Sequence, residues 1–265
     1  MNKTLFMQGW KSNYKFLIAF CAILTMYFSI MITMYDPKLE SALSQFSKSL
    51  PEIMSMFGMM QTSATLIGFL STYLYGMLML VFPMIFTIML AIRLISKQVD
   101  HGFMAYLLAS PNSRLKVSIT QMMVILSNLF VLILYCTLVG IIGCAFAFPN
   151  QLDTLAFLRL NVGVFILHVA LAAIFYLVSC IFNEARNATF LASSIAVVFY
   201  LIQMLANMGG NLENFKYATI FTLFNSEQLI FGSNEAYYKL SILLLLAIIC
   251  FGIGNLIFKK KDMPL

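Results

Sequence analysis

Charged residues are scarce in this sequence. Asp, Glu, Lys and Arg make up 10% of its 265 residues, against about 25% in ordinary soluble domains. Hydrophobic residues make up 62%, and the mean hydropathy is +0.92. A soluble domain of this length could not cover its surface with so few charges. The composition therefore excludes a soluble protein and indicates an integral membrane protein.

The sequence also lacks the alternation of apolar and polar residues that is typical of outer-membrane β-barrels. Its apolar runs are instead about twenty residues long or longer, which is the length that an α-helix needs to cross a bilayer. We therefore predict an all-α membrane protein with a single transmembrane domain over residues 1–265.

Catalytic and nucleotide-binding motifs are missing. The sequence contains no G-x-x-x-x-G-K-[ST], no H-E-x-x-H and no G-x-S-x-G. The chain thus lacks the usual loop for nucleotide phosphates, the zinc-protease helix and the hydrolase nucleophile turn. We expect a protein that is not an enzyme and that binds no metal and no cofactor of its own.

Acidic residues are missing from the apolar runs. All ten lie in loops or at the ends of runs, whereas carriers driven by protons or sodium place acids within their spans. His168 is the ionisable side chain nearest the middle of a run. Any transport by this chain therefore needs an energy source on another molecule.

Cysteine pairs with metal or redox spacing are missing as well. No C-x-x-C occurs, and the cysteines indicate small buried hydrophobic residues rather than disulfides or metal ligands. The formal net charge is +6, but the basic residues stand at the ends of apolar runs and form no continuous stripe, so no nucleic-acid partner is expected. All five cysteines lie inside apolar runs: Cys21, Cys136, Cys144, Cys180 and Cys250.

The sequence does contain six apolar runs that are long enough to span a membrane. We predict transmembrane helices at about 16–34, 64–92, 115–148, 157–182, 188–208 and 240–258.

Three further features of the sequence predict local structure in or beside the spans. Residues 1–15 place three lysines among apolar residues at roughly helical spacing, which predicts an amphipathic helix at the inner interface, with a frayed basic tail as the alternative. Pro83 predicts a kink in the second span because proline removes a backbone donor. The segment 211–239 is largely apolar over Tyr217–Phe231 but too interrupted to cross, which predicts a re-entrant or interfacial helical pair.

The distribution of charge predicts the topology. If both termini are cytosolic, eleven of the 16 Lys and Arg residues lie inside, but only three of the ten Asp and Glu residues do. Inner loops of membrane proteins carry such an excess of basic residues. We predict a multi-pass protein of the cytoplasmic membrane with six spans and both termini cytosolic.

Polar side chains within the spans are candidates for a translocation pathway. The three hydroxyls of the first span recur every four residues and so share one helix face, where helix packing is the alternative role. The histidine of the fourth span is either part of a proton relay or a neutral, hydrogen-bonded side chain. The candidates are Thr25, Ser29, Thr33, His168, Gln203 and Asn207.

The polar stretch 93–116 lies between the second and third spans, on the inner side. Its Asp100-His101-Gly102, followed by LLASPNSR at 107–114, resembles the acidic-x-Gly-Thr and Leu-Leu-x-x-Pro-x-x-Arg of the coupling helix in permeases of type-2 ABC exporters. Phe103 replaces the usual Thr, and Gln98 stands where a second acid is common. The resemblance assigns ATPase coupling to Asp100, His101, Gly102, Phe103, Tyr106, Leu107, Leu108, Pro111 and Arg114.

The six-span topology, the apolar segment before the last span and the basic ending at 258–262 are also similar to that family. The resemblance implies a transport subunit whose ATP and Mg are held by a partner ATPase, present in two copies. A second permease, identical or homologous, and the lipid bilayer complete the expected partners. The expected cargo is amphipathic or hydrophobic, namely a peptide, a drug or a lipid, with antimicrobial peptides and multiple drugs within that range.

Two other functions remain as alternatives. One is an ion-coupled secondary transporter that uses His168. The other is a non-transporting membrane protein, either an immunity or sensor protein or a membrane enzyme. For the stretch 93–116, the alternative to a docking helix is an interfacial helix that lies on lipid.

Overall fold

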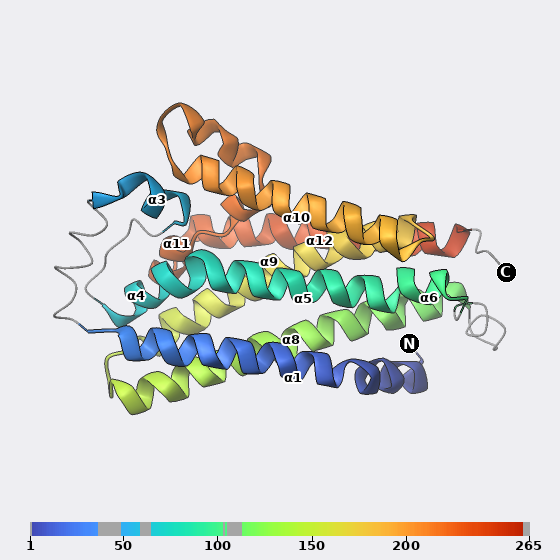
Figure 1. Ribbon diagram of the computed structural model, residues 1–265, viewed down its shortest axis with the longest axis horizontal. Coiled ribbons are helices and arrows are strands. Elements are labelled where there is room, and N and C mark those ends of the chain that lie inside the picture. Colours follow the sequence, from blue (N-terminus) through green and yellow to red (C-terminus); the bar gives the residue numbers. More distant parts are fainter. Residues whose placement is uncertain (1, 37–48, 59–64, 103, 105–112, 262–265) are drawn as a thin grey trace.

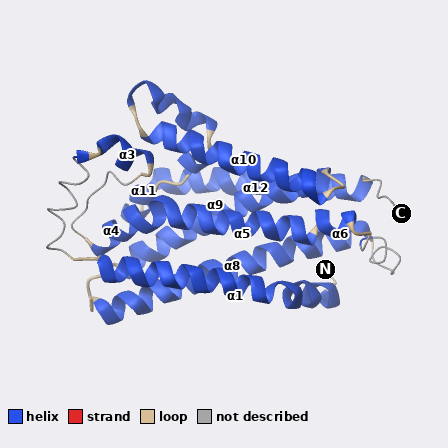
Figure 2. Ribbon diagram, in the orientation of Figure 1, coloured by secondary structure: helices blue, strands red, loops and turns tan. Residues whose placement is uncertain are grey.

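The computed structural model of the chain describes residues 2–36, 49–58, 65–102, 104 and 113–261. Within these ranges the chain forms helices and turns and no strand (Figure 2). In chain order the elements are α1 (Lys3–Met34), α3 (Pro51–Met56), α4 (Leu66–Tyr73), the π-helical turn η2 (Leu74–Leu78), α5 (Met79–Leu94), α6 (Ser96–Asp100), α8 (Arg114–Ala147), α9 (Thr154–Ile181), α10 (Ala185–Asn207), the 3-10 segments η3 (Gly210–Ala218) and η4 (Ile220–Leu223), α11 (Ser226–Phe231) and α12 (Asn234–Lys260).

Six helical stretches in the described part of the chain are long and apolar enough to cross a membrane, as the prediction of six spans requires. They are α1, the run from α4 to α6, α8, α9, α10 and α12. Several begin before the predicted residue because a polar side chain caps them. Asp153, for example, accepts a hydrogen bond from the Ala156 N–H at 3.0 Å and starts α9 early.

The prediction of a separate helix or tail before the first span is wrong. Residues 3–15 do not form a separate amphipathic helix, nor a frayed tail, because they are the first turns of α1. The amphipathic character is real, since Leu5 and Gly9 are buried while Lys3 and Lys11 are exposed. The helix continues through Asn13 because its side-chain amide donates to the Gly9 carbonyl at 2.7 Å and so does not compete with the helix.

The second span is irregular one turn before its proline. Pro83 lies inside α5, and the wide turn η2 precedes it. Gly76 stands in that turn, where an added Cβ would lie 3.0 Å from the Phe57 carbonyl oxygen. The predicted departure from a straight helix therefore takes the form of a π-helical turn against which a loop backbone packs.

Helix α9 forms the centre of the bundle, and most of its surface is buried. Helix α12 packs along it, with Gly254 against Tyr176. Helices α5 and α8 cover other sides of α9, and α1 packs on α8 (Figure 1). The beginning of α1 and the end of α12 lie at the same end of the bundle, here called the inner end (Figure 1).

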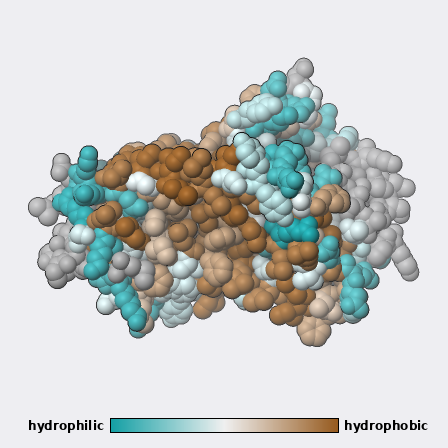
Figure 3. Space-filling model, turned by 180° about the vertical axis from the view of Figure 1, so that it is seen from behind, coloured by the Kyte–Doolittle hydropathy of each residue, from teal (hydrophilic) through white to brown (hydrophobic). Residues whose placement is uncertain are grey.

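The side of the molecule in Figure 3 carries a broad apolar band between ends where hydrophilic residues gather. Such a band suits contact with lipid chains. The sidedness of the inner end, which the charge distribution predicts to be cytosolic, remains a prediction.

The segment after α10 folds back along that helix (Figure 1). The Thr219 hydroxyl donates to the Phe199 carbonyl at 3.0 Å, and Phe199 stands eight residues before the end of α10, about 12 Å along its axis. Ile220 and Phe221 are buried. Residues 234–239, predicted to belong to this segment, are the first turns of α12 instead. Its re-entrant position in the membrane remains a prediction.

Gly140 of α8 is packed too closely for a side chain. An added Cβ would lie 2.5 Å from Phe157 Cζ and 3.1 Å from Phe28 Cε1, where α1, α8 and α9 meet. We expect Gly140→Ala to destabilise the protein by about 1–3 kcal/mol through overpacking, measured by thermal unfolding in detergent. Gly252→Ala is the matched control, because no atom lies within 4 Å of its added Cβ. Equal unfolding temperatures for the two variants would contradict the packing described.

Candidate functional site

The structure describes part of the predicted coupling stretch. Asp100 ends α6, His101 follows it at the surface, and Gly102 has a φ of +71°, a conformation that favours glycine. Asp100 Oδ2 accepts a hydrogen bond from the Ala185 N–H at 3.2 Å. The acidic residue of the motif is thereby tied to the first residue of α10. The coupling residues outside the described ranges are Phe103, Tyr106, Leu107, Leu108 and Pro111.

Arg114, the last residue of the motif, contacts its own chain. Its guanidinium donates to the Lys261 carbonyl at 2.7 Å, and the Lys261 ammonium donates to the Phe182 carbonyl at 2.5 Å. These two bonds join the start of α8, the residue after α12 and the end of α9. Burial lowers the pKa of Lys261 to about 8.

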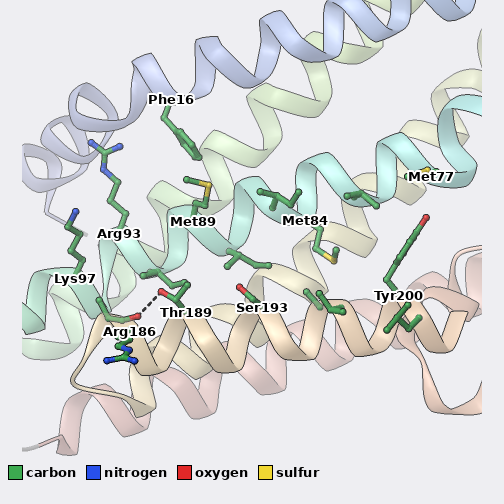
Figure 4. A pocket seen from close by; sticks show the side chains of 18 residues that line it. Phe16, Met77, Met84, Met89, Arg93, Lys97, Arg186, Thr189, Ser193 and Tyr200 are labelled. Carbon is green, nitrogen blue, oxygen red and sulfur yellow. Dashed lines mark hydrogen bonds between the residues drawn. The ribbon is translucent and has the colours of Figure 1, made fainter. Parts of the chain in front are cut away.

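A cavity of about 910 Å³ lies between α5 and α10, with Phe16 of α1 at one side (Figure 4). Its walls are largely apolar, and three methionines, Met77, Met84 and Met89, stand on the α5 side. Cationic side chains occupy the inner end of the cavity, and Tyr200 lies at the opposite end (Figure 4).

The sequence of α10 explains why it forms one wall. Ala188, Ala192 and Ala196 recur every four residues and are buried, so they form a small-residue face for close helix packing. The next face of the same helix carries Thr189 and Ser193, which line the cavity. The small face thus fixes α10 to the bundle while the neighbouring face is left open to the cavity.

A smaller cavity of about 350 Å³ lies toward the other end of the same helices. Gln203 and Asn207 line it and are bonded in series. The Gln203 amide donates to Asn207 Oδ1 at 2.8 Å, and the Asn207 amide donates to the Met56 carbonyl at 3.2 Å. Thr222 donates to Gln203 Oε1 at 3.1 Å. Tyr200 lines both this smaller cavity and the larger one.

The hydroxyls of α1 lie away from both cavities. Thr25 donates to the Cys21 carbonyl at 2.7 Å and shares a 2.8 Å hydrogen bond with the Tyr135 hydroxyl of α8. Thr33 donates to the Ser29 carbonyl at 2.9 Å. These threonines therefore satisfy helix carbonyls and help α1 to pack on α8.

His168 is fully buried between α9 and α5 and lines neither cavity. Its Nδ1 lies 2.8 Å from the Val164 carbonyl oxygen and its Nε2 lies 3.1 Å from the Leu80 carbonyl oxygen. Leu80 stands one turn before Pro83, where the missing N–H loosens the helix bonding. The histidine thus holds two spans together at the irregular part of α5.

The cavity walls contain residues that the sequence interpretation did not select. The topology prediction used the charges of Arg93, Lys97 and Arg186, and no binding role was predicted for them. No role was predicted for the face of α10 beside its alanines. The sequence signal that could have identified this wall lies in residues 185–207. There a face of small residues is followed, one position along, by a face of mixed polar and apolar residues. In the described ranges, no group of three or more His, Cys, Asp or Glu residues has the geometry of a metal site.

Six helical stretches that are long and apolar enough to cross a membrane, with an apolar cavity between α5 and α10, define the class of multi-pass helical membrane proteins. The sequence matches the family described as ABC-2 family transporter protein over residues 13–263. The chain therefore belongs to the ABC-2 transporter family, as the motif had indicated. No curated protein matches the chain.

Family membership establishes a coarse description of the protein. It is a multi-pass protein of the cell membrane and a transport subunit of a generally non-catalytic kind. The family also implies an ABC transporter complex with an ATPase partner.

The bond from Asp100 to the Ala185 N–H predicts local protection of α10. We expect Asp100→Ala to raise hydrogen–deuterium exchange of the first-turn amides of α10 by about 2- to 30-fold, because losing a carboxylate cap costs roughly 0.5–2 kcal/mol. Asp100→Asn, which keeps an acceptor oxygen, should have a smaller effect. Asp153→Ala is the control, since it uncaps α9 only. Unchanged exchange in α10 would show that the bond does not stabilise the first turn of this helix.

The lowered pKa of Lys261 predicts its chemical reactivity. An amine-acylating reagent attacks only the neutral amine, so labelling of Lys261 should reach half its maximum near pH 8 rather than near the usual value of about 10.4. Mass spectrometry of labelled peptides measures this midpoint. Arg114→Ala removes the bond that holds the Lys261 backbone, so its midpoint should move upward. A wild-type midpoint near 10 would contradict the burial of the ammonium.

Proposed function

We propose that the chain is the membrane-spanning subunit of an ATP-driven exporter that moves an amphipathic or hydrophobic substrate out of the cell. The observation that carries the proposal is the apolar cavity of about 910 Å³ between α5 and α10. Cavities of roughly 300–1,000 Å³ with apolar walls are typical of small-molecule sites. Peptides, drugs and lipids are the cargo classes that such walls suit.

The two cavities support an outward route. They lie in sequence along α5 and α10, and Tyr200 lines both. A substrate that enters the larger cavity at its inner end would pass Tyr200 to reach the smaller one. The hydrogen bonds of Gln203 and Asn207 then close the outer end against α3 and η4. Opening outward requires those bonds to break.

Energy for the movement comes from a partner in this proposal. The sequence has no phosphate-binding loop, and His168 lines neither cavity. Two ATPase chains, each holding ATP and Mg, dock on the stretch 100–114 of two permeases, which are identical or homologous. A short apolar helix that fills a cleft on a soluble partner is a common mode of recognition.

The Asp100–Ala185 hydrogen bond supports a path for coupling. Residues 100–102 lead directly into the docking stretch, and Ala185 begins the helix that forms one wall of the cavity. A displacement of the docking stretch would therefore act first on the inner end of α10. The remaining walls, on α5, continue into α6 and so into the same stretch.

The apolar residues of the motif test the proposed docking. We expect the wild-type chain, affinity-purified from membranes of cells that produce it, to retain an ABC ATPase, identified by mass spectrometry and by ATP hydrolysis. Leu107→Glu combined with Leu108→Glu should reduce the retained ATPase at least about tenfold, because burying carboxylates in an apolar contact is unfavourable by several kcal/mol.

The matched control replaces two exposed apolar residues near the other end of the molecule. Leu50→Glu combined with Ile53→Glu adds the same charges on and beside α3, and it should leave ATPase retention unchanged. The proposal is wrong if no ATPase is retained by the wild type, or if the Leu107 and Leu108 variant retains as much as the control.

A further inference from the structure

We infer that the cavity between α5 and α10 binds an anionic amphiphile, with its acidic head at the inner end and its apolar chain along the walls. The observation is the placement of Arg93, Lys97 and Arg186 at one end of an otherwise apolar cavity (Figure 4). This inference rests on the proposed export function and names the class of cargo for the same site.

The three cations come from both walls of the cavity. Arg93 is in the last turn of α5, Lys97 is in α6, and Arg186 is the second residue of α10. All three side chains are exposed. One guanidinium nitrogen of Arg93 donates to the Ser12 carbonyl at 3.0 Å, which positions the group and leaves other N–H donors for a ligand. An acidic head at this end would meet positive charge from two sides.

Among the residues that the structure describes, no acidic side chain lines the cavity. The two acids nearest in sequence, Asp100 and Glu184, are not among the lining residues, and each accepts a hydrogen bond from its own chain. Asp100 Oδ2 accepts from the Ala185 N–H, and Glu184 Oε2 accepts from the Asn187 amide at 2.8 Å. Residues 103–112, outside the described ranges apart from 104, contain no Asp or Glu in their sequence. The salt bridges within the described ranges, Lys216–Glu213 and Lys239–Glu235, belong to other segments.

The rest of the cavity suits a long apolar chain. From Arg186 to Leu201 the wall on α10 rises by fifteen residue steps, about 22 Å. This length exceeds one leaflet of a hydrocarbon core about 30 Å thick. Methionines are flexible and polarizable, so Met77, Met84 and Met89 can adapt to a chain of variable shape. Thr189 donates to the Ala185 carbonyl at 2.7 Å and so offers no competing donor at the wall (Figure 4).

Charge also excludes other cargo from the site. A cationic peptide or drug would place its charge against three like charges at the inner end. A zwitterionic head gains less, because its ammonium meets the same cations as its phosphate. An amphiphile with a net negative phosphate or carboxylate head is therefore favoured over both.

Lipid retention by the full-length chain tests the inference. The protein is reconstituted in vesicles of equal phosphatidylglycerol and phosphatidylcholine with the same acyl chains, then extracted in detergent, and the bound lipids are counted by native mass spectrometry. We expect about tenfold more phosphatidylglycerol than phosphatidylcholine, a difference of about 1.4 kcal/mol. Arg93→Gln, Lys97→Gln and Arg186→Gln combined should abolish this preference.

A charge-matched variant separates the cavity from the general inner surface. Lys11→Gln, Lys15→Gln and Lys259→Gln combined remove three exposed cations that do not line the cavity, and the preference should persist. Equal loss of preference in both triple variants would overturn the inference. Displacement of the lipid by inorganic phosphate at equal concentration would do so too, because the site would then recognise a free anion.

A second variant tests the apolar part without changing charge. Ser193→Trp fills the cavity from the α10 wall and should lower retention of phosphatidylglycerol at least about fivefold. Unchanged retention would contradict the inference. A change from a larger to a smaller oligomer with unchanged retention would mean that a second copy of the chain fills the cavity instead.

Failure of this inference is distinguishable from failure of the exporter proposal. ATPase retention is measured on the same preparations. An ATPase retained without any preference for anionic lipid would leave the exporter proposal standing and remove the anionic cargo. A preference for anionic lipid without a retained ATPase would leave a lipid-binding cavity and remove the exporter.

Discussion

The structure depends on one constraint, the need to satisfy every backbone hydrogen-bonding group without water. In a bilayer an unpaired N–H or C=O is costly, so spans must be helical and each irregularity needs a local substitute. Some buried side-chain amides also bond to the helix backbone. The amides of Asn128 and Asn161 donate to carbonyls four residues earlier, at 2.8 and 2.9 Å. These side chains enter the core because the backbone already provides their acceptors.

The same constraint accounts for the irregular second span. Pro83 removes a donor from α5, and the wide turn η2 lies just before it. His168 reaches the Leu80 carbonyl from α9, and Tyr75 donates to Asn161 Oδ1 at 2.9 Å. Side chains of the central helix are thus hydrogen-bonded to the irregular part of the second span. This irregular region lies where the larger cavity gives way to the smaller one, since Gly76 and Leu80 line the latter.

Much of the fold could be predicted from sequence, and the reason is physical. A run of apolar residues is recognised as a span from its own length and composition. The six spans could therefore be located without knowing which helices pack against one another. The continuity of residues 3–15 with the first span could not, because it depends on Asn13 bonding within its own helix and on Gly9 lying against Val124 of α8.

The site was less predictable, because a cavity is a property of pairs of helices. The motif at 100–114 could be identified, but not the hydrogen bond that joins Asp100 to Ala185. Arg93 and Arg186 lie far apart in the sequence, and only the pairing of α5 with α10 makes them two sides of one cavity. Gln203 and Asn207 were selected as pathway residues, and their bonds to neighbouring segments give them a place at the outer end of that route.

The packing of α12 along α9 has a consequence for biosynthesis. Spans enter the membrane in the order in which they are made, yet the most extensively packed neighbour of the central helix is the last span of the chain. Gly254 and Tyr176, which meet in that contact, are separated by 77 intervening residues. The contact of α9 with α12 can therefore form only after α12 has been inserted, whereas the packing of α9 on α5 and α8 needs only spans made earlier.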